Sequence, residues 1–246
     1  MLPLLFVRIP QSARLEGSEG RRKSSVLADM GEGLRFLRGW PGLMMMVGIA
    51  TLINLLFTPA FSLQPRLVTR HFGGGAAELA WLQSALGIGM VLGGVTLGAW
   101  GGFKSRTLTG VLALALAGVA VTMVGLTPAT ALPLAIGAMF VTVCMLPIAN
   151  GSMFAVMQAI VPPEVQGRVF SLVISGASVM SSIGLAAAGP VADAMGVQVW
   201  YLTAGIGIAA MGFGASLVPA IMRIEETARR TREAAEPEHA ASAATR

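Results

Sequence analysis

The sequence predicts an all-α integral membrane protein with six transmembrane helices, and three observations support this. Of its 246 residues, 54% are hydrophobic and only 12% are charged, whereas soluble domains carry roughly 25% charged residues. The mean hydropathy is +0.73. The apolar residues are gathered into long uncharged runs, and about 20 such residues cross a bilayer as one helix. The composition therefore excludes both a disordered chain and a water-soluble globule.

Six apolar runs follow one another along the chain. The longest, between Arg106 and Glu164, is far too long for one helix, and the dipeptide Thr127-Pro128 predicts a turn inside it. Lys104 and Arg106 must lie outside the membrane, because two cations at its centre cost about 5 kcal/mol or more. We expect spans at Gly42–Pro65, Leu79–Phe103, Thr107–Leu126, Ala131–Val161, Val169–Ala192 and Val197–Met222.

Charged or polar tails flank the spans. Residues 1–10 begin with an apolar stub that is too short to span, and residues 11–40 are predicted to be a cytoplasmic linker that contains a surface amphipathic helix. Residues 41–222 form the predicted six-helix transmembrane domain, and residues 223–246 form a cytoplasmic tail.

The distribution of Lys and Arg predicts the orientation. If six helices alternate in direction, fifteen of the 17 cationic residues fall on one side of the membrane, and only Arg66 and Arg70 fall on the other. Cytoplasmic segments are enriched in Lys and Arg, so we expect both termini in the cytoplasm and the protein in the cell (plasma or inner) membrane. This placement accounts for the sequence pI near 10.6 without a nucleic-acid partner. The aromatic residues expected at helix ends, where their rings prefer the membrane interface, are Trp40, Trp81, Trp100 and the Trp200-Tyr201 pair.

The residue inventory argues against an enzyme. One cysteine (Cys144) excludes a disulfide framework, and His71 and His239 are too few and too far apart for a histidine-based metal centre. The sequence contains neither a phosphate-binding glycine loop followed by lysine nor a plausible nucleophile–histidine–acid set. We therefore predict no catalytic residue, no metal and no cofactor.

Uncharged polar residues occur inside the predicted spans, whereas no ionisable residue falls well inside any of them. Amide and hydroxyl groups beside flexible methionines suit a cavity for an amphipathic organic solute. The alternative is that small polar residues pack the helices together. For the serine stripe both interpretations stay open, whereas Asn54 and Asn150, each close to a proline, favour the cavity. The cavity candidates are Asn54, Gln83, Asn150, Gln158, Ser175 and Ser178.

Glycines spaced four residues apart predict helix packing in the second span. Gly89 with Gly93, and Gly94 with Gly98, form two overlapping pairs of small residues, which allow neighbouring helices to approach closely. The six helices also divide into two triplets, and the first helix of each carries an asparagine near an internal proline. Such corresponding interruptions are typical of the repeats of transporters, so the sequence predicts a 3+3 inverted repeat.

Several motifs resemble those of the major facilitator superfamily, in particular its macrolide and drug-efflux branch. Val161–Leu172 resembles the loop between the tenth and eleventh helices of these exporters. Asn54 with the following prolines, His71–Gly75 and Gly98–Lys104 are similar to helices seven and eight, and Gly189–Asp193 is similar to the end of helix eleven.

The resemblance implies twelve helices, with two six-helix halves around a central cavity, and proton-driven export by alternating access. It implies that this chain is the C-terminal half, helices 7–12, with residues 1–10 as the remnant of the preceding transmembrane helix. Lys104, Arg106, Glu164 and Arg168 would then belong to the cytoplasmic loops, where Arg168 would help to latch its loop.

We therefore expect a transporter of small amphipathic solutes or drugs, with the lipid bilayer and a small-molecule substrate as partners. A separately encoded N-terminal half or a second copy of the chain would complete it. The alternative is a non-transporting membrane scaffold or an inert truncated fragment.

Overall fold

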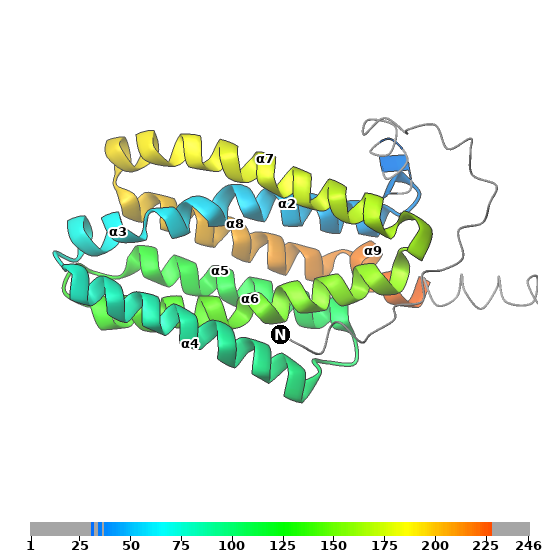
Figure 1. Ribbon diagram of the computed structural model, residues 1–246, viewed down its shortest axis with the longest axis horizontal. Helices are drawn as coiled ribbons and strands as arrows, with labels where there is room; N and C mark the ends of the chain where they lie inside the picture. Colours follow the sequence, from blue (N-terminus) through cyan, green and yellow to red (C-terminus); the bar gives the residue numbers. More distant parts are fainter. Residues whose placement is uncertain (1–30, 32–33, 36, 228–246) are drawn as a thin grey trace, which may run out of the picture.

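The computed structural model describes residues 31, 34–35 and 37–227, and in this part of the chain it contains helices and no strand (Figure 1). The expected segment 1–10, most of the linker 11–40 and the tail beyond residue 227 lie outside the described residues. The elements are α2 (Pro41–Ser62), α3 (Gln64–Arg66), η2 (Leu67–His71), α4 (Ala76–Trp100), α5 (Arg106–Leu126), α6 (Leu132–Ile160), α7 (Pro163–Met195), α8 (Val197–Leu217) and α9 (Pro219–Met222).

The six predicted spans are confirmed as six helices that are long and apolar enough to cross a membrane, namely α2 and α4 to α8. Their ends differ from the expected ones. The helix α4 ends at Trp100 instead of Phe103, because Gly101 and Gly102 adopt positive φ angles of 73° and 83° that stop the helix. The helix α7 begins at Pro163, so most of the predicted loop Val161–Leu172 is helical.

The six long helices pack in the lateral order α7, α2, α8, α5, α6, α4 (Figure 1). Along the seam between α4 and α6, Gly93 lies against Cys144 and Gly151 lies against Leu97, so these two helices run in the same direction. Helices α2 and α7 also run in the same direction, because Gly176 lies against Thr51 and Gly184 against Leu55. Each parallel pair thus joins helices that are far apart in the sequence.

This packing order reproduces the predicted 3+3 repeat. The first helix of the first triplet (α2) packs against the second helix of the second (α7), and α6, the first helix of the second triplet, packs against α4 in the same way. Both contacts are glycine-mediated: a Cβ at Gly184 would overlap the Leu55 carbonyl oxygen, and a Cβ at Gly93 would overlap the Cys144 carbonyl oxygen. The third helices of the two triplets, α5 and α8, pack against each other in the centre. A two-fold axis that exchanges the triplets would pass between these two helices.

The central pair α5 and α8 is antiparallel and packed backbone to backbone. Gly118 of α5 lies directly against Ala209, and Gly205 and Gly212 of α8 lie against Thr122 and Ala115 in the same register. Small residues allow this approach, which gives dispersion contacts that larger side chains would prevent. The seam makes α5 and α8 the centre of the bundle.

The two ends of the bundle carry different charges. We call the end where α2, α5 and α7 begin the basic end, and Arg38, Lys104, Arg168 and Arg223 lie there among the described residues. At the opposite end the two arginines Arg66 and Arg70 both pair with Asp193 of α7, with N–O distances of 3.0 and 3.6 Å.

The aromatic pair Trp200-Tyr201 lies near the start of α8, as the sequence predicted, but its rings are buried against α2. The Trp200 indole N–H donates to the Leu56 carbonyl at 3.2 Å, and the Tyr201 hydroxyl donates to the Ala60 carbonyl. Burial is favourable here because the two polar groups satisfy carbonyls in the C-terminal half of α2. Trp81, by contrast, is 60% exposed and remains available to the bilayer.

Candidate functional site

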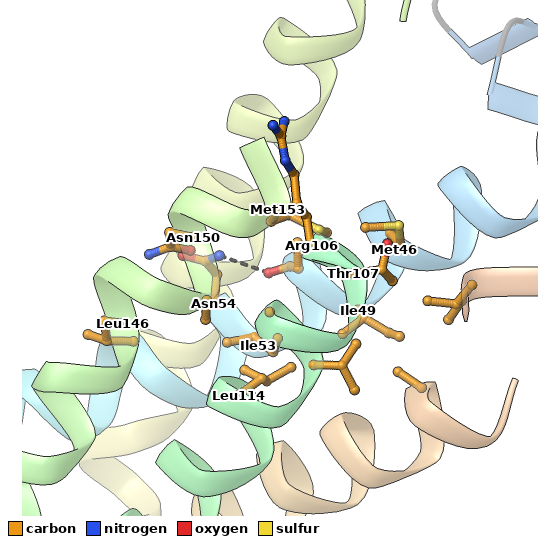
Figure 2. A pocket seen from close by; sticks show the side chains of 16 residues that line it. Met46, Ile49, Ile53, Asn54, Arg106, Thr107, Leu114, Leu146, Asn150 and Met153 are labelled. Carbon is orange, nitrogen blue, oxygen red and sulfur yellow. Dashed lines mark hydrogen bonds between the residues drawn. The ribbon is translucent and has the colours of Figure 1, made fainter. Parts of the chain in front are cut away.

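A pocket of about 110 Å³ opens between α2, α5 and α6 and reaches toward the basic end, where α8 and α9 border it (Figure 2). Its lining is mostly apolar, because the facing sides of these helices carry isoleucine, leucine, alanine and methionine. The lining residues are Met46, Ile49, Ala50, Ile53, Asn54, Arg106, Thr107, Gly110, Val111, Leu114, Leu146, Ala149, Asn150, Met153, Ala215 and Ile221.

The two asparagines of the chain both line this pocket, one from α2 and one from α6 (Figure 2). The Asn54 amide nitrogen donates to the Ala50 carbonyl one turn earlier, at 2.8 Å, which fixes the side chain along its own helix. Pro59 lies inside α2, five residues after Asn54, and Pro147 lies inside α6, three residues before Asn150. The sequence suggested both residues as candidates to line a cavity, and in the structure both line the same pocket.

The mouth of the pocket is polar. Arg106, the first residue of α5, extends from it, and the Thr107 side chain is 2% exposed (Figure 2). Thr107 donates from its backbone N–H and from its hydroxyl to Oε1 of Glu225, at 2.9 and 3.1 Å. Met46 of α2 and Met153 of α6 also line the pocket, and flexible thioether side chains adapt to ligands of different shape. Within this lining no acidic residue or histidine occurs, so the chemistry offered is hydrogen bonding, apolar contact and one guanidinium.

The other four cavity candidates do not line this pocket. Gln83 lies near the opposite end, where its amide nitrogen is 3.4 Å from Oε1 of the buried Gln64. Gln158, Ser175 and Ser178 are exposed on α6 and α7, on surfaces that no described part of this chain covers. The Ser178 hydroxyl donates to the Ile174 carbonyl of its own helix at 2.8 Å.

The glycines of the second span divide into two groups. The buried Gly89 and Gly93 lie against Phe140 and Cys144 of α6. Gly94 and Gly98 have open space where a Cβ would stand, because they lie on a side of α4 that no other described helix covers. The four-residue spacing alone did not distinguish the two pairs.

Three of the four charged residues assigned to loops lie at helix starts instead. Arg106 begins α5, and Glu164 and Arg168 lie in the first turns of α7. Lys104 alone of these four lies between helices.

Sequence reasoning missed three features of the pocket: Thr107, Ile221 and the contact of Thr107 with Glu225. The signal for Thr107 was weak, since a threonine at a helix start is common. Ile221 belongs to the expected sixth span, but that helix breaks at Val218 and α9 turns toward the pocket. Ile221 and the Glu225 contact do not follow from hydropathy, because both depend on where the chain goes after α8.

Comparison with known proteins shows that the chain is similar to efflux proteins. It is 27% identical over 91% of its length to macrolide efflux protein A of Streptococcus pyogenes, covering 55% of that protein. It is 32% identical over 86% of its length to the multidrug efflux pump Tap of Mycolicibacterium fortuitum, covering 52% of it. It is 27% identical over 80% of its length to the MFS-type transporter YfiS of Bacillus subtilis, covering 48% of it.

The chain matches one half of a major facilitator drug-efflux transporter. These similarities confirm the resemblance found in the sequence motifs. They do not favour the alternative of a non-transporting scaffold or an inert fragment. The chain spans about half the length of the curated relatives it matches. These relatives are named as transporters or efflux pumps, and with six apolar helices the chain is a multi-pass membrane protein. No protein-family model matches the chain, and no solved structure does.

Proposed function

We propose that this chain is the C-terminal half of a drug exporter of the major facilitator type, and that its pocket forms one wall of the solute path. The observation that carries the proposal is that Asn54 and Asn150, from the first helix of each triplet, face one apolar pocket. An amphipathic solute would bury its apolar surface there and hydrogen bond to the amides. Transport would proceed by alternating access of this pocket to the two sides of the membrane.

The size of the pocket supports the need for a second half. A site that encloses a drug-sized molecule has a volume of roughly 300–1,000 Å³, whereas this pocket measures about 110 Å³. The exposed polar side chains Gln158, Ser175 and Ser178 would line the remainder of the path in the complete transporter. The partner would be a separately encoded six-helix half or a second copy, and native mass spectrometry of the purified assembly distinguishes the two by subunit mass.

The orientation belongs to the same proposal. With the basic end in the cytoplasm of a cell whose plasma membrane holds the protein, the pocket opens toward the cytoplasm, where an exported solute would enter. Both termini would then be cytoplasmic. Proton coupling, if the complete transporter uses it, would require residues outside this pocket, since its lining offers no acidic group or histidine.

A binding experiment tests the site, with erythromycin as a macrolide probe and the purified assembly of this chain with its second half in detergent. Asn54→Leu and Asn150→Leu each remove one hydrogen-bonding group worth roughly 1 kcal/mol, so each is expected to weaken binding about five- to tenfold. Thr203→Val on α8 is the control, because Thr203 is exposed and bonds only to its own helix. Equal affinities in the four assemblies, or no binding by the parent assembly, would contradict the proposal.

A further inference from the structure

The chain does not leave the bundle when α8 ends. The helix α8 stops at Leu217, Val218 is extended with ψ 109°, and α9 then turns across the basic end (Figure 1). The segment Val218–Thr227, which we call the strap, continues for one further helical turn. Ile221 and Ile224 of the strap are 1% and 2% exposed, so it is packed into the protein as firmly as a core element.

The strap borders the pocket at the basic end. Ile221 lines the pocket together with Met46 of α2, and both belong to one apolar cluster with Ile224 and Leu43. Gly42 of α2 leaves room for the strap to approach: a Cβ at this position would overlap the Ala220 carbonyl oxygen and lie 3.2 Å from Cδ1 of Ile224. The strap therefore closes the basic end by direct contact with α2.

One carboxylate holds the far side of the strap. Oε1 of Glu225 accepts hydrogen bonds from the backbone N–H and the hydroxyl of Thr107, at 2.9 and 3.1 Å. Thr107 is the second residue of α5, where a backbone N–H has no partner within the helix, and the helix dipole there favours a negative charge. Ser105 satisfies the next such group by accepting from the Leu108 N–H at 3.2 Å. The Glu225 carboxylate thus ties the strap across the mouth of the pocket.

We propose that the strap is a gate at the basic end of the pocket, and that the Glu225–Thr107 contact is the latch that holds it closed. Glu225 is a positioning residue, because it acts on the solute only through the strap and Ile221. The inference rests on the proposed function in one respect, namely that the pocket lies on the solute path. When the latch opens, the Met46 side of the pocket becomes accessible from the basic end.

Access to the pocket can be measured without any solute. In a Cys144→Ala background, Met46→Cys places a thiol at a position that is 5% exposed beneath the strap. The rate at which a water-soluble maleimide modifies this thiol reports how often the gate opens. Glu225→Ala removes two hydrogen bonds to a charged group, and we expect about tenfold faster modification, since a tenfold change in the open population corresponds to about 1.4 kcal/mol.

Two matched controls isolate the latch. Glu78→Ala removes a carboxylate that accepts from the Gly75 N–H at 2.7 Å at the start of α4, at the opposite end, and should leave the rate unchanged. Gly42→Ala pushes the strap away from α2 without touching Glu225 and should accelerate modification as well. Gly48→Ala on the same helix has open space for its Cβ and should not.

A second reporter separates gating from unfolding. Val124→Cys introduces a thiol at a fully buried position near the far end of α5, and its rate should stay low in every variant. Parallel acceleration at both reporters in Glu225→Ala would overturn the gate, because it would mean a general loss of stability. An unchanged Met46→Cys rate in Glu225→Ala would overturn the latch, even if Gly42→Ala accelerated the reaction. Failure of the asparagine variants to alter erythromycin binding would leave these rates untouched, so the two proposals fail independently.

Discussion

The helices α5 and α7 have similar hydropathy but very different environments. Their most apolar windows have mean hydropathies of 2.1 and 1.8, yet 56% of the α5 window is buried inside the protein and only 11% of the α7 window. The reason is position in the bundle: α5 has α8 on one side and α6 on the other, whereas α7 lies at an edge beside α2. In a membrane, hydropathy measures compatibility with lipid and does not distinguish lipid contact from protein contact.

The two helices also differ in how much of their surface is free to contact a solute or a partner. More than half of the α5 window is buried by packing, and besides the side that lines the pocket only a stripe from Leu112 to Leu126 is exposed. The surface of α7 carries hydroxyls and large apolar side chains that nothing in the described chain covers, including Ile174 at 61% exposure. A bilayer or a second six-helix half must cover such a surface.

The largest expected effect lies in the α5–α8 seam. Gly118→Ala would place a Cβ against the Ala209 backbone, and overpacking against backbone that cannot move aside should cost about 3 kcal/mol. Gly94→Ala faces open space and should be neutral or stabilising by up to about 1 kcal/mol, because alanine favours the helix. The free energy of unfolding from an SDS titration in micelles measures both. Equal effects would show that α5 is no more tightly held than an edge helix.

An intermediate effect is expected where α8 meets α2. Tyr201 is fully buried, and Tyr201→Phe leaves the Ala60 carbonyl without its phenol donor, at a cost of about 1–2 kcal/mol. The same SDS titration measures the loss. Thr203→Val on the exposed side of α8 serves as the control and should change the free energy by less than about 0.5 kcal/mol. A neutral Tyr201→Phe would mean that the hydrogen bond contributes nothing to the seam.

A smaller effect is expected at the one side-chain hydrogen bond found between α2 and α7 in the described chain. The hydroxyls of Thr58 and Ser181 are 2.9 Å apart. A double-mutant cycle of Thr58→Val and Ser181→Ala should give a coupling of about 0.6 kcal/mol, typical of such bonds between membrane helices. A coupling near zero would mean that glycine packing alone holds α7 against α2. The edge helix α7 would then be held even less tightly, relative to α5, than the structure indicates.

The smallest effect is expected on the exposed serine face of α7. Ser175→Ala and Ser178→Ala should each change the free energy of unfolding by less than about 0.5 kcal/mol, because both side chains are exposed. A maleimide should modify Ser175→Cys much faster than Val121→Cys, whose position is 2% exposed. Slow modification at position 175 in the purified assembly would instead indicate that a partner covers this face.

The sequence by itself determined the membrane class and the number of spans, and it carried the resemblance to one half of an efflux transporter. Uncharged runs of helical length can be satisfied in a bilayer only as helices, and charges such as Lys104 fix where the runs end. It also singled out Asn54 and Asn150, because an amide beside a proline is costly in lipid unless it lines a cavity. Each of these features depends on residues that are close together along the chain, so the sequence was sufficient to predict it.

Only the tertiary structure decided which surfaces meet. Gly93 packs and Gly94 does not, although both follow the same spacing, because one position in a helix turns its neighbours by about 100°. Trp200 and Tyr201 are buried because α2 offers carbonyls within their reach, and Ile221 reaches the pocket because the chain bends after Leu217. Such contacts join residues that are far apart in the sequence, and hydropathy along the chain carries no information about them.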